Sequence, residues 1–219
     1  TLAVLGHAAF LHYSIDTIAG QSLSALNLAS LACWLIALFF TFLVITRPFE
    51  KLAVIVFPLA ALSILFAYWF PQEHFVATAK DLRNLWHILL AIVTFSVLAF
   101  AGIQAFLLAL QDRHLRLKNH FSWLNRLPPL DAMEKLLFQT LVIGFLFLTV
   151  LLWSSVYFYH EALWSQQLSK TVVACVAWII FAVLILGRKL LGWRGKKALV
   201  CTSLGVGLVL ILYFGAYLA

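Results

Sequence analysis

The sequence predicts an all-α protein, a polytopic transmembrane helix bundle with seven visible helices. Hydrophobic residues make up 64% of the 219 residues and charged residues only 11%, which excludes a soluble domain with a charged surface. The apolar residues collect in long runs of the length that crosses a bilayer as a helix. These runs lack the alternation of barrel strands, and unpaired backbone is costly in lipid, so helices are the only spanning structure left.

The apolar runs define the expected helices in chain order. They cover residues 2–15, 23–46, 52–70, 87–110, 136–159, 171–186 and 198–218. The first run is short and begins without a methionine, so we expect an eighth helix upstream in the full-length protein. Pro58 lies inside the third run, where proline bends a helix. Residues 1–219 are expected to form a single integral membrane domain.

Basic residues predict the orientation of these helices. Most of the 15 Lys and Arg residues lie in the loops at 47–51, 112–135 and 187–197, which follow alternate runs. Loops rich in Lys and Arg face the cytoplasm, so we expect these three loops on that side. Membrane topology therefore explains the net charge of +7, and no nucleic-acid partner is predicted.

Residues that could carry catalysis are few. Cys33, Cys175 and Cys201 lie inside apolar runs without a CxxC pair, so neither thiol redox chemistry nor a zinc site is predicted. No Asp, Glu, Lys or Arg lies in the middle of a run, which argues against an ion pump or a proton-coupled transporter. Because no nucleophile or acid–base pair is evident, the sequence does not predict an enzyme.

The histidines carry the functional prediction. Those in the first run or toward the outer side of the predicted topology are His7, His12, His74, His87 and His160. Imidazole at a bilayer edge is costly unless it is hydrogen-bonded or bound to a metal, and each of these histidines taken singly has an ordinary structural explanation. Zinc needs three or four ligands at fixed spacing, and no such motif is present. Haem needs only one or two histidines and an apolar pocket.

Aromatic residues accompany these histidines. Trp86 and Trp164 belong to the aromatic set on the predicted outer side, which would either line a haem pocket or form an interfacial belt. His12 and His74 are assigned structural roles. His114 lies in the basic loop, where we expect it to contact lipid headgroups or nothing.

Four stretches carry a resemblance to a known family. They are GQSLSALNLASL at 20–31, LWHILLAIVTFSVLAFAGIQA at 85–105, LPPLDAMEKLLFQTLVIGFLFLTV at 127–150, and AWIIFAVLILGRKLLGWRGKKA at 177–198 followed by YFGAYL at 213–218. In their order and spacing they resemble the cytochrome c assembly family of haem-handling membrane proteins, with its CcsA, CcmC and HemX groups. The resemblance covers nearly the whole chain.

The resemblance also implies a set of site residues. His87 matches the family's first periplasmic haem-ligand histidine, and Trp86 is expected to pack near it. His7 resembles an intramembrane histidine of one branch, so His87 and His7 are the expected ligands of a haem b iron. The tryptophan-rich WxWD loop of the family is replaced by HEALWSQQLSK at 160–170, which retains Trp164 and adds His160 as cofactor contacts.

The function that the resemblance implies is haem binding or haem handling in cytochrome c assembly, in a bacterial inner membrane. The expected partners are membrane lipid, haem and other membrane proteins of cytochrome maturation or haem biosynthesis. Three alternatives stay open: a HemX-like regulatory scaffold of haem biosynthesis, a haem-free accessory subunit of a small-molecule or ion transporter, and a structural partner in a larger complex.

Overall fold

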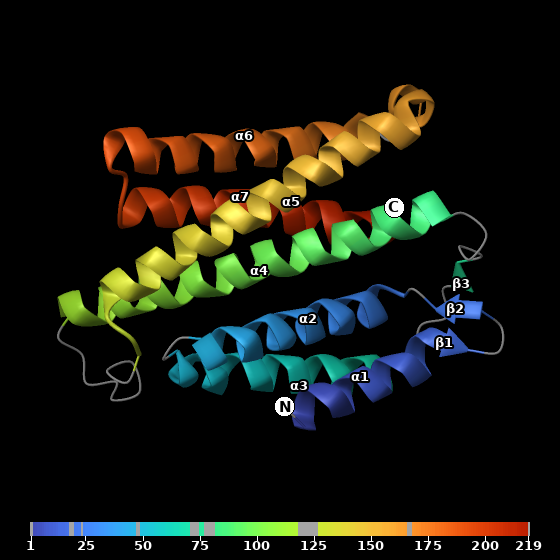
Figure 1. The fold of residues 1–219 in the computed structure, drawn as a ribbon, viewed down its shortest axis with the longest axis horizontal. Coiled ribbons are helices and arrows are strands. Elements are labelled where there is room, and N and C mark those ends of the chain that lie inside the picture. Colours follow the sequence, from blue (N-terminus) through green and yellow to red (C-terminus); the bar gives the residue numbers. More distant parts are fainter. Residues whose placement is uncertain are drawn as a thin grey trace. The chain divides into compact units, whose positions relative to one another are not determined.

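The computed structural model describes residues 2–17, 20–22, 24–46, 49–70, 75–76, 82–117, 127–165 and 168–218. Across these residues the chain forms seven α-helices (Figure 1), so the predicted all-α membrane bundle is confirmed. The helices are α1 (Leu2–Ile15), α2 (Ala25–Thr46), α3 (Ala53–Trp69), α4 (Leu82–Leu117), α5 (Leu130–Ser165), α6 (Leu168–Leu191) and α7 (Lys196–Leu218), with the short 3-10 helix η1 (Glu50–Leu52).

The apolar runs located every helix, but α4 and α5 extend well past the predicted ends. An apolar run marks the part of a helix that suits hydrocarbon, whereas backbone hydrogen bonding continues into polar flanks made of good helix formers. The start of α5 follows two prolines, and the Pro129 carbonyl accepts hydrogen bonds from the N–H groups of Ala132 and Met133. In the described part of the chain, α2, α4, α5, α6 and α7 are long and apolar enough to cross a membrane, while α1 and α3 are apolar but shorter.

The chain divides into two compact units, residues 1–96 and residues 97–219, and the boundary falls inside α4. The first unit contains α1, α2, α3 and the N-terminal part of α4. The second contains the remainder of α4 and the helices α5, α6 and α7. The single domain expected for residues 1–219 stays a prediction.

In the first unit, α2 packs against both α1 and α3. The indole Nε1 of Trp34 on α2 donates a hydrogen bond to the Val4 carbonyl of α1 at 2.8 Å. Three short strands lie in the connections, β1 (Asp16–Thr17), β2 (Gly20–Ser22) and β3 (Phe75–Val76), and they pair antiparallel in the order β1-β2-β3. Strands this short have no readable periodicity in sequence, which is why they were not predicted from the apolar runs.

Asn27 joins the sheet to the helices of the first unit. Its Nδ2 donates to the carbonyls of Ser14, at the end of α1, and Ser22, in β2, at 3.2 and 3.1 Å. The Ser24 hydroxyl accepts from the Asn27 backbone N–H at 3.2 Å and so caps α2. These two carbonyl partners account for the burial of this polar side chain.

In the second unit, α6 and α7 form an antiparallel pair (Figure 1). Their turn contains Gly192 and Gly195 at φ angles of 63° and 57°, a left-handed backbone that favours glycine. A Cβ atom on Gly205 of α7 would lie 2.6 Å from Cζ of Phe181 on α6, so only glycine allows this close approach. The Trp178 Nε1 of α6 donates to the Thr149 hydroxyl of α5 at 2.9 Å.

Candidate functional site

His7 lies inside the first unit, between α1 and α2. Its side chain is only 3% exposed, and its Nε2 lies 2.9 Å from the Ser30 hydroxyl oxygen of α2, which is itself fully buried. The imidazole that the resemblance offered as an iron ligand therefore already has a hydrogen-bond partner. Binding iron through Nε2 would require His7 to give up Ser30.

His87 lies in the second turn of α4, also in the first unit, and its residue is partly exposed. Consecutive residues of a helix point about 100° apart, so Trp86 and His87 face different directions. Trp86 is exposed. Any contact that Trp86 makes with a ligand therefore lies on the surface of this unit, while His87 lies nearer its interior.

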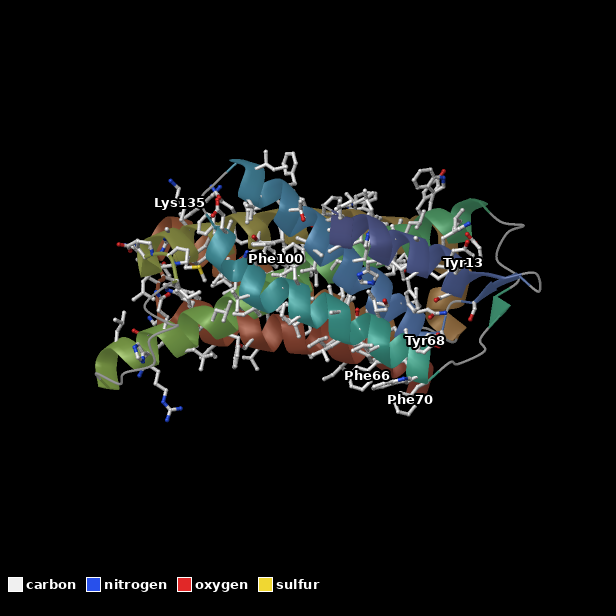
Figure 2. All side chains as sticks on the ribbon, turned by 90° about the horizontal axis from the view of Figure 1, so that it is seen from below. Tyr13, Phe66, Tyr68, Phe70, Phe100 and Lys135 are labelled. Atoms are coloured by element: carbon white, nitrogen blue, oxygen red, sulfur yellow. The ribbon has the colours of Figure 1, made fainter. Side chains whose placement is uncertain are left out.

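Exposed aromatic side chains gather at the end of the first unit that carries the strands. Figure 2 labels three of them at the C-terminal end of α3, namely Phe66, Tyr68 and Phe70. The rings of Phe66 and Phe70 stack with centroids 6.4 Å apart. Tyr13 near the end of α1 is exposed as well (Figure 2). This aromatic end, as we call it, suits either the membrane interface or a flat apolar ligand.

His12 forms a hydrogen bond with Asp16 at this aromatic end. Its Nδ1 lies 2.9 Å from Oδ2 of Asp16, one helical turn further along, and both side chains are largely exposed. Because a carboxylate only accepts hydrogen bonds, Nδ1–H of His12 is the donor in this contact. His12 was assigned a structural role from the sequence, and this partner was not foreseen.

The remaining site predictions fall partly outside the described residues. His160 and Trp164 lie in the last part of α5, in the second unit, but the described side chains do not include theirs. His74 lies wholly outside the described residues. His114 was expected in a loop, in contact with lipid headgroups or nothing, but it lies on α4, which continues past the predicted run, and it is only 7% exposed.

A charge cluster in the second unit was not predicted from the sequence. The Glu134 carboxylate of α5 accepts hydrogen bonds from Arg188 of α6 and from Arg194 of the following turn. Arg194 reaches Asp131 as well, at 3.2 Å. These arginines were interpreted only as markers of topology. The two acidic residues one turn apart at the start of α5 were the available signal, but nothing in the sequence matched them to partners so distant.

These features define a multi-pass α-helical membrane protein. The family model described as Cytochrome C assembly protein matches residues 2–219. The chain therefore belongs to the cytochrome c assembly protein family, and the resemblance drawn from the four stretches is confirmed.

Individual relatives agree with this assignment. The chain is 29% identical to inner membrane protein YpjD of Escherichia coli (strain K12) over 217 residues, which cover 98% of this chain and 82% of the relative. It is 25% identical to a cytochrome c biogenesis protein CcsA of Prochlorococcus marinus over 202 residues, covering 78% of this chain and 64% of the relative. It is 40% identical to CcsA of Welwitschia mirabilis over 89 residues, covering 39% and 29%. No solved structure was found to match the chain significantly.

The residues of the first unit fit a haem group in its basic requirements. Haem iron takes one or two imidazole ligands, and the porphyrin needs apolar and aromatic surface. A partly exposed His87 and the aromatic end supply both kinds of group within one unit. Among the described residues no cluster of three His, Cys, Asp or Glu side chains could hold a bare metal ion.

Proposed function

We propose that this chain handles haem during the assembly of c-type cytochromes, as a multi-pass protein of a bacterial inner membrane. Cytochromes c hold their haem iron with His and Met, so a family that assembles them must meet haem. The family match over residues 2–219 and the relatives' names, cytochrome c biogenesis protein and inner membrane protein, support the proposal. The regulatory scaffold and the haem-free transporter subunit gain no support from these relatives.

The observation that carries the proposal is His87, a partly exposed imidazole in the second turn of α4. In this proposal His87 would bind the iron of a haem b, with Trp86 at the edge of the site. Bound haem would supply redox chemistry through its iron. The chain's own residues bind and orient the group, and the proposal assigns no catalytic residue.

His7, His160 and Trp164 complete the set that the resemblance implies. His7 is the second ligand on that basis, although its Nε2 would have to exchange the Ser30 hydroxyl for iron. The resemblance also names His160 and Trp164 of α5 as cofactor contacts, and that part of the set stays a prediction. The WD pair of the family's haem-presenting loop is absent from HEALWSQQLSK, so presentation of haem to an apocytochrome is not part of the proposal.

The proposed orientation follows the basic loops. With residues 47–51, 112–135 and 187–197 in the cytoplasm, α4 begins on the opposite side of the membrane, and His87 belongs to the outer leaflet region. The proposed partners are membrane lipid, haem and other membrane proteins of cytochrome maturation or haem biosynthesis.

An absorption spectrum of the detergent-purified full-length protein, oxidised and reduced, tests the function after expression with added haem precursor. We expect a Soret band that His87→Ala weakens at least severalfold without changing the yield of folded, membrane-inserted protein. Cys175→Ser is the matched control, because it removes an exposed thiol that could bind iron but is not assigned to the site. A wild-type protein that folds but shows no Soret band would contradict the proposal.

A further inference from the structure

The turn between α6 and α7 carries exposed cations beside two helices that are long enough to cross a membrane. We call residues 187–197 the basic turn. We propose that the basic turn binds the headgroup of an anionic phospholipid through Lys189, Lys196 and Lys197. This inference goes beyond the proposed handling of haem and does not depend on it, because it rests on the second unit and on the membrane class alone.

The basic turn joins the antiparallel helices α6 and α7 (Figure 1) and is hydrogen-bonded to the end of α6. The backbone N–H of Trp193 donates to the Gly187 carbonyl at 3.1 Å, and Nη1 of Arg188 donates to the Trp193 carbonyl at 3.2 Å. The indole ring of Trp193 packs directly on Gly187, where a Cβ atom would lie 2.6 Å from Cδ2 of the ring. The turn therefore presents its exposed side chains from a defined backbone.

The lysines of the basic turn lack the counter-charges that its arginines have. The two carboxylates at the start of α5 already bind Arg188 and Arg194. Lys189, Lys196 and Lys197 are exposed, and none of them forms an ion pair with a carboxylate in the part of the chain that the structure describes. Their positive charges are therefore available to an external anion.

Helix stability does not explain the two lysines that begin α7. Lys196 and Lys197 lie in its first turn, which contains no acidic residue. The N-terminal end of a helix carries a partial positive charge, so cations there are unfavourable and a nearby anion is favourable. Nζ of Lys197 lies 5.5 Å from the centroid of the Trp193 ring, a cation–π contact that positions this ammonium group at the turn. A phosphate between the lysines and the helix end would offset the repulsion.

The place of the basic turn in a membrane favours a phospholipid as this anion. The turn separates the candidate spans Lys170–Leu191 and Lys196–Gly215, so its residues lie at the level of the headgroups. Leu190 and Leu191 are 79% and 70% exposed, and they offer apolar contact to an acyl chain that a soluble phosphate would not use. At a membrane surface with net negative headgroups, each Lys or Arg contributes about fivefold in affinity.

Native mass spectrometry of the full-length protein in detergent tests the proposal, with phosphatidylglycerol and zwitterionic phosphatidylcholine of the same acyl chains titrated separately. We expect phosphatidylglycerol to bind at least about fivefold more tightly than phosphatidylcholine. Lys196→Gln combined with Lys197→Gln should remove this preference, whereas Lys196→Arg combined with Lys197→Arg should retain it. Excess inorganic phosphate should not displace the lipid, because it has no acyl chain to contact the leucines.

Arg113→Gln combined with Lys170→Gln is the matched control, because it removes two exposed positive charges outside the basic turn. This control should keep the preference of the wild type for phosphatidylglycerol. A wild type without the preference, or a preference that survives the two glutamine substitutions in the turn, would overturn the proposal. An equal loss in the control would show only a general attraction to the protein surface and would overturn it too. Displacement by inorganic phosphate would exclude a lipid as the occupant.

Discussion

Arg188 of α6 donates a hydrogen bond to Glu134 of α5, although 54 sequence positions separate the two residues. The guanidinium of Arg188 also lies 4.6 Å above the Phe138 ring and donates to the Trp193 carbonyl at 3.2 Å. Arg194 binds the same Glu134 oxygen at 3.2 Å. Basic residues that indicate orientation in the sequence therefore also close one end of the second unit, where α5, α6 and the turn to α7 meet.

Glu134→Gln should destabilise the protein substantially. The Glu134 and Arg188 side chains are only 11% and 26% exposed, so removing the carboxylate leaves a largely buried guanidinium without its counter-charge. We expect a loss of about 3 kcal/mol in the free energy of unfolding, at the low end for buried pairs because Arg188 keeps some solvent contact. Equilibrium unfolding in mixed micelles measures this loss in the free energy of unfolding.

Two further variants make this prediction specific. Asp131→Asn should change stability by less than about 1 kcal/mol, because Asp131 is 90% exposed. Adding Arg188→Met to Glu134→Gln should recover part of the loss, since no charge then remains buried without a partner. Equal losses in Glu134→Gln and Asp131→Asn would show that the cluster does not act as a buried pair.

Gly205→Ala should weaken the packing of α6 against α7. The new Cβ would lie 2.6 Å from Cζ of the fully buried Phe181 ring, so the two helices must move apart or the ring must change position. We expect a loss of about 1–3 kcal/mol, seen as a lower Tm in detergent. Gly207→Ala is the matched control on the same helix, because nothing lies within 4 Å of its Cβ position. A Tm decrease of the same size in both variants would contradict the close contact.

A double-mutant cycle can measure the hydrogen bond between His7 and Ser30. Ser30→Ala leaves the buried Nε2 of His7 without its partner, so we expect a loss of about 1–3 kcal/mol. In the double variant with His7→Phe, the loss should be smaller than the sum of the two single losses by about 0.5–3 kcal/mol. Ser96→Ala is the control, since this buried hydroxyl donates only to the Ile92 carbonyl of its own helix. Additive losses for His7 and Ser30 would mean that the pair contributes nothing.

Asn27→Asp should loosen the joint between α1 and β2. The substitution removes both Nδ2 donors and sets a carboxylate against the carbonyls of Ser14 and Ser22. Hydrogen exchange should then speed up at the end of α1 and in β2. Ser24→Ala removes only the cap of α2 and should speed exchange in the first turn of that helix alone. If both variants give the same exchange pattern, Asn27 does not couple the two segments.

The helices could be predicted because each membrane-spanning helix is marked by a long apolar run in the sequence. Each of the seven apolar runs became a helix, and the run at 2–15 has the same limits as α1. Helix ends outside the apolar runs were less predictable, since polar turns continue α4 as far as Leu117. The three-stranded sheet was not predicted, because strands of two and three residues form only when distant segments pair.

The candidate site was also predictable only in part. The sequence indicated which histidines could bind iron, and it ranked His7 above His12. Only the packing of α1 on α2 determines that Ser30 holds Nε2 of His7, 23 positions away, whereas Asp16 orients His12 from one turn along. The i,i+4 spacing of His12 and Asp16 was visible in the sequence, but the sequence did not show which imidazole stays accessible.

The amino-acid sequence by itself determined the membrane class, the order of the helices and the family, because burial in lipid depends on the composition of about 20 consecutive residues. Tertiary structure decided which polar side chains have partners: Glu134 with Arg188, His7 with Ser30, and Asn27 with two carbonyls. Hydrogen bonds and ion pairs act over a few ångströms, so they depend on which helix faces meet. That information is not contained in any single stretch of the chain.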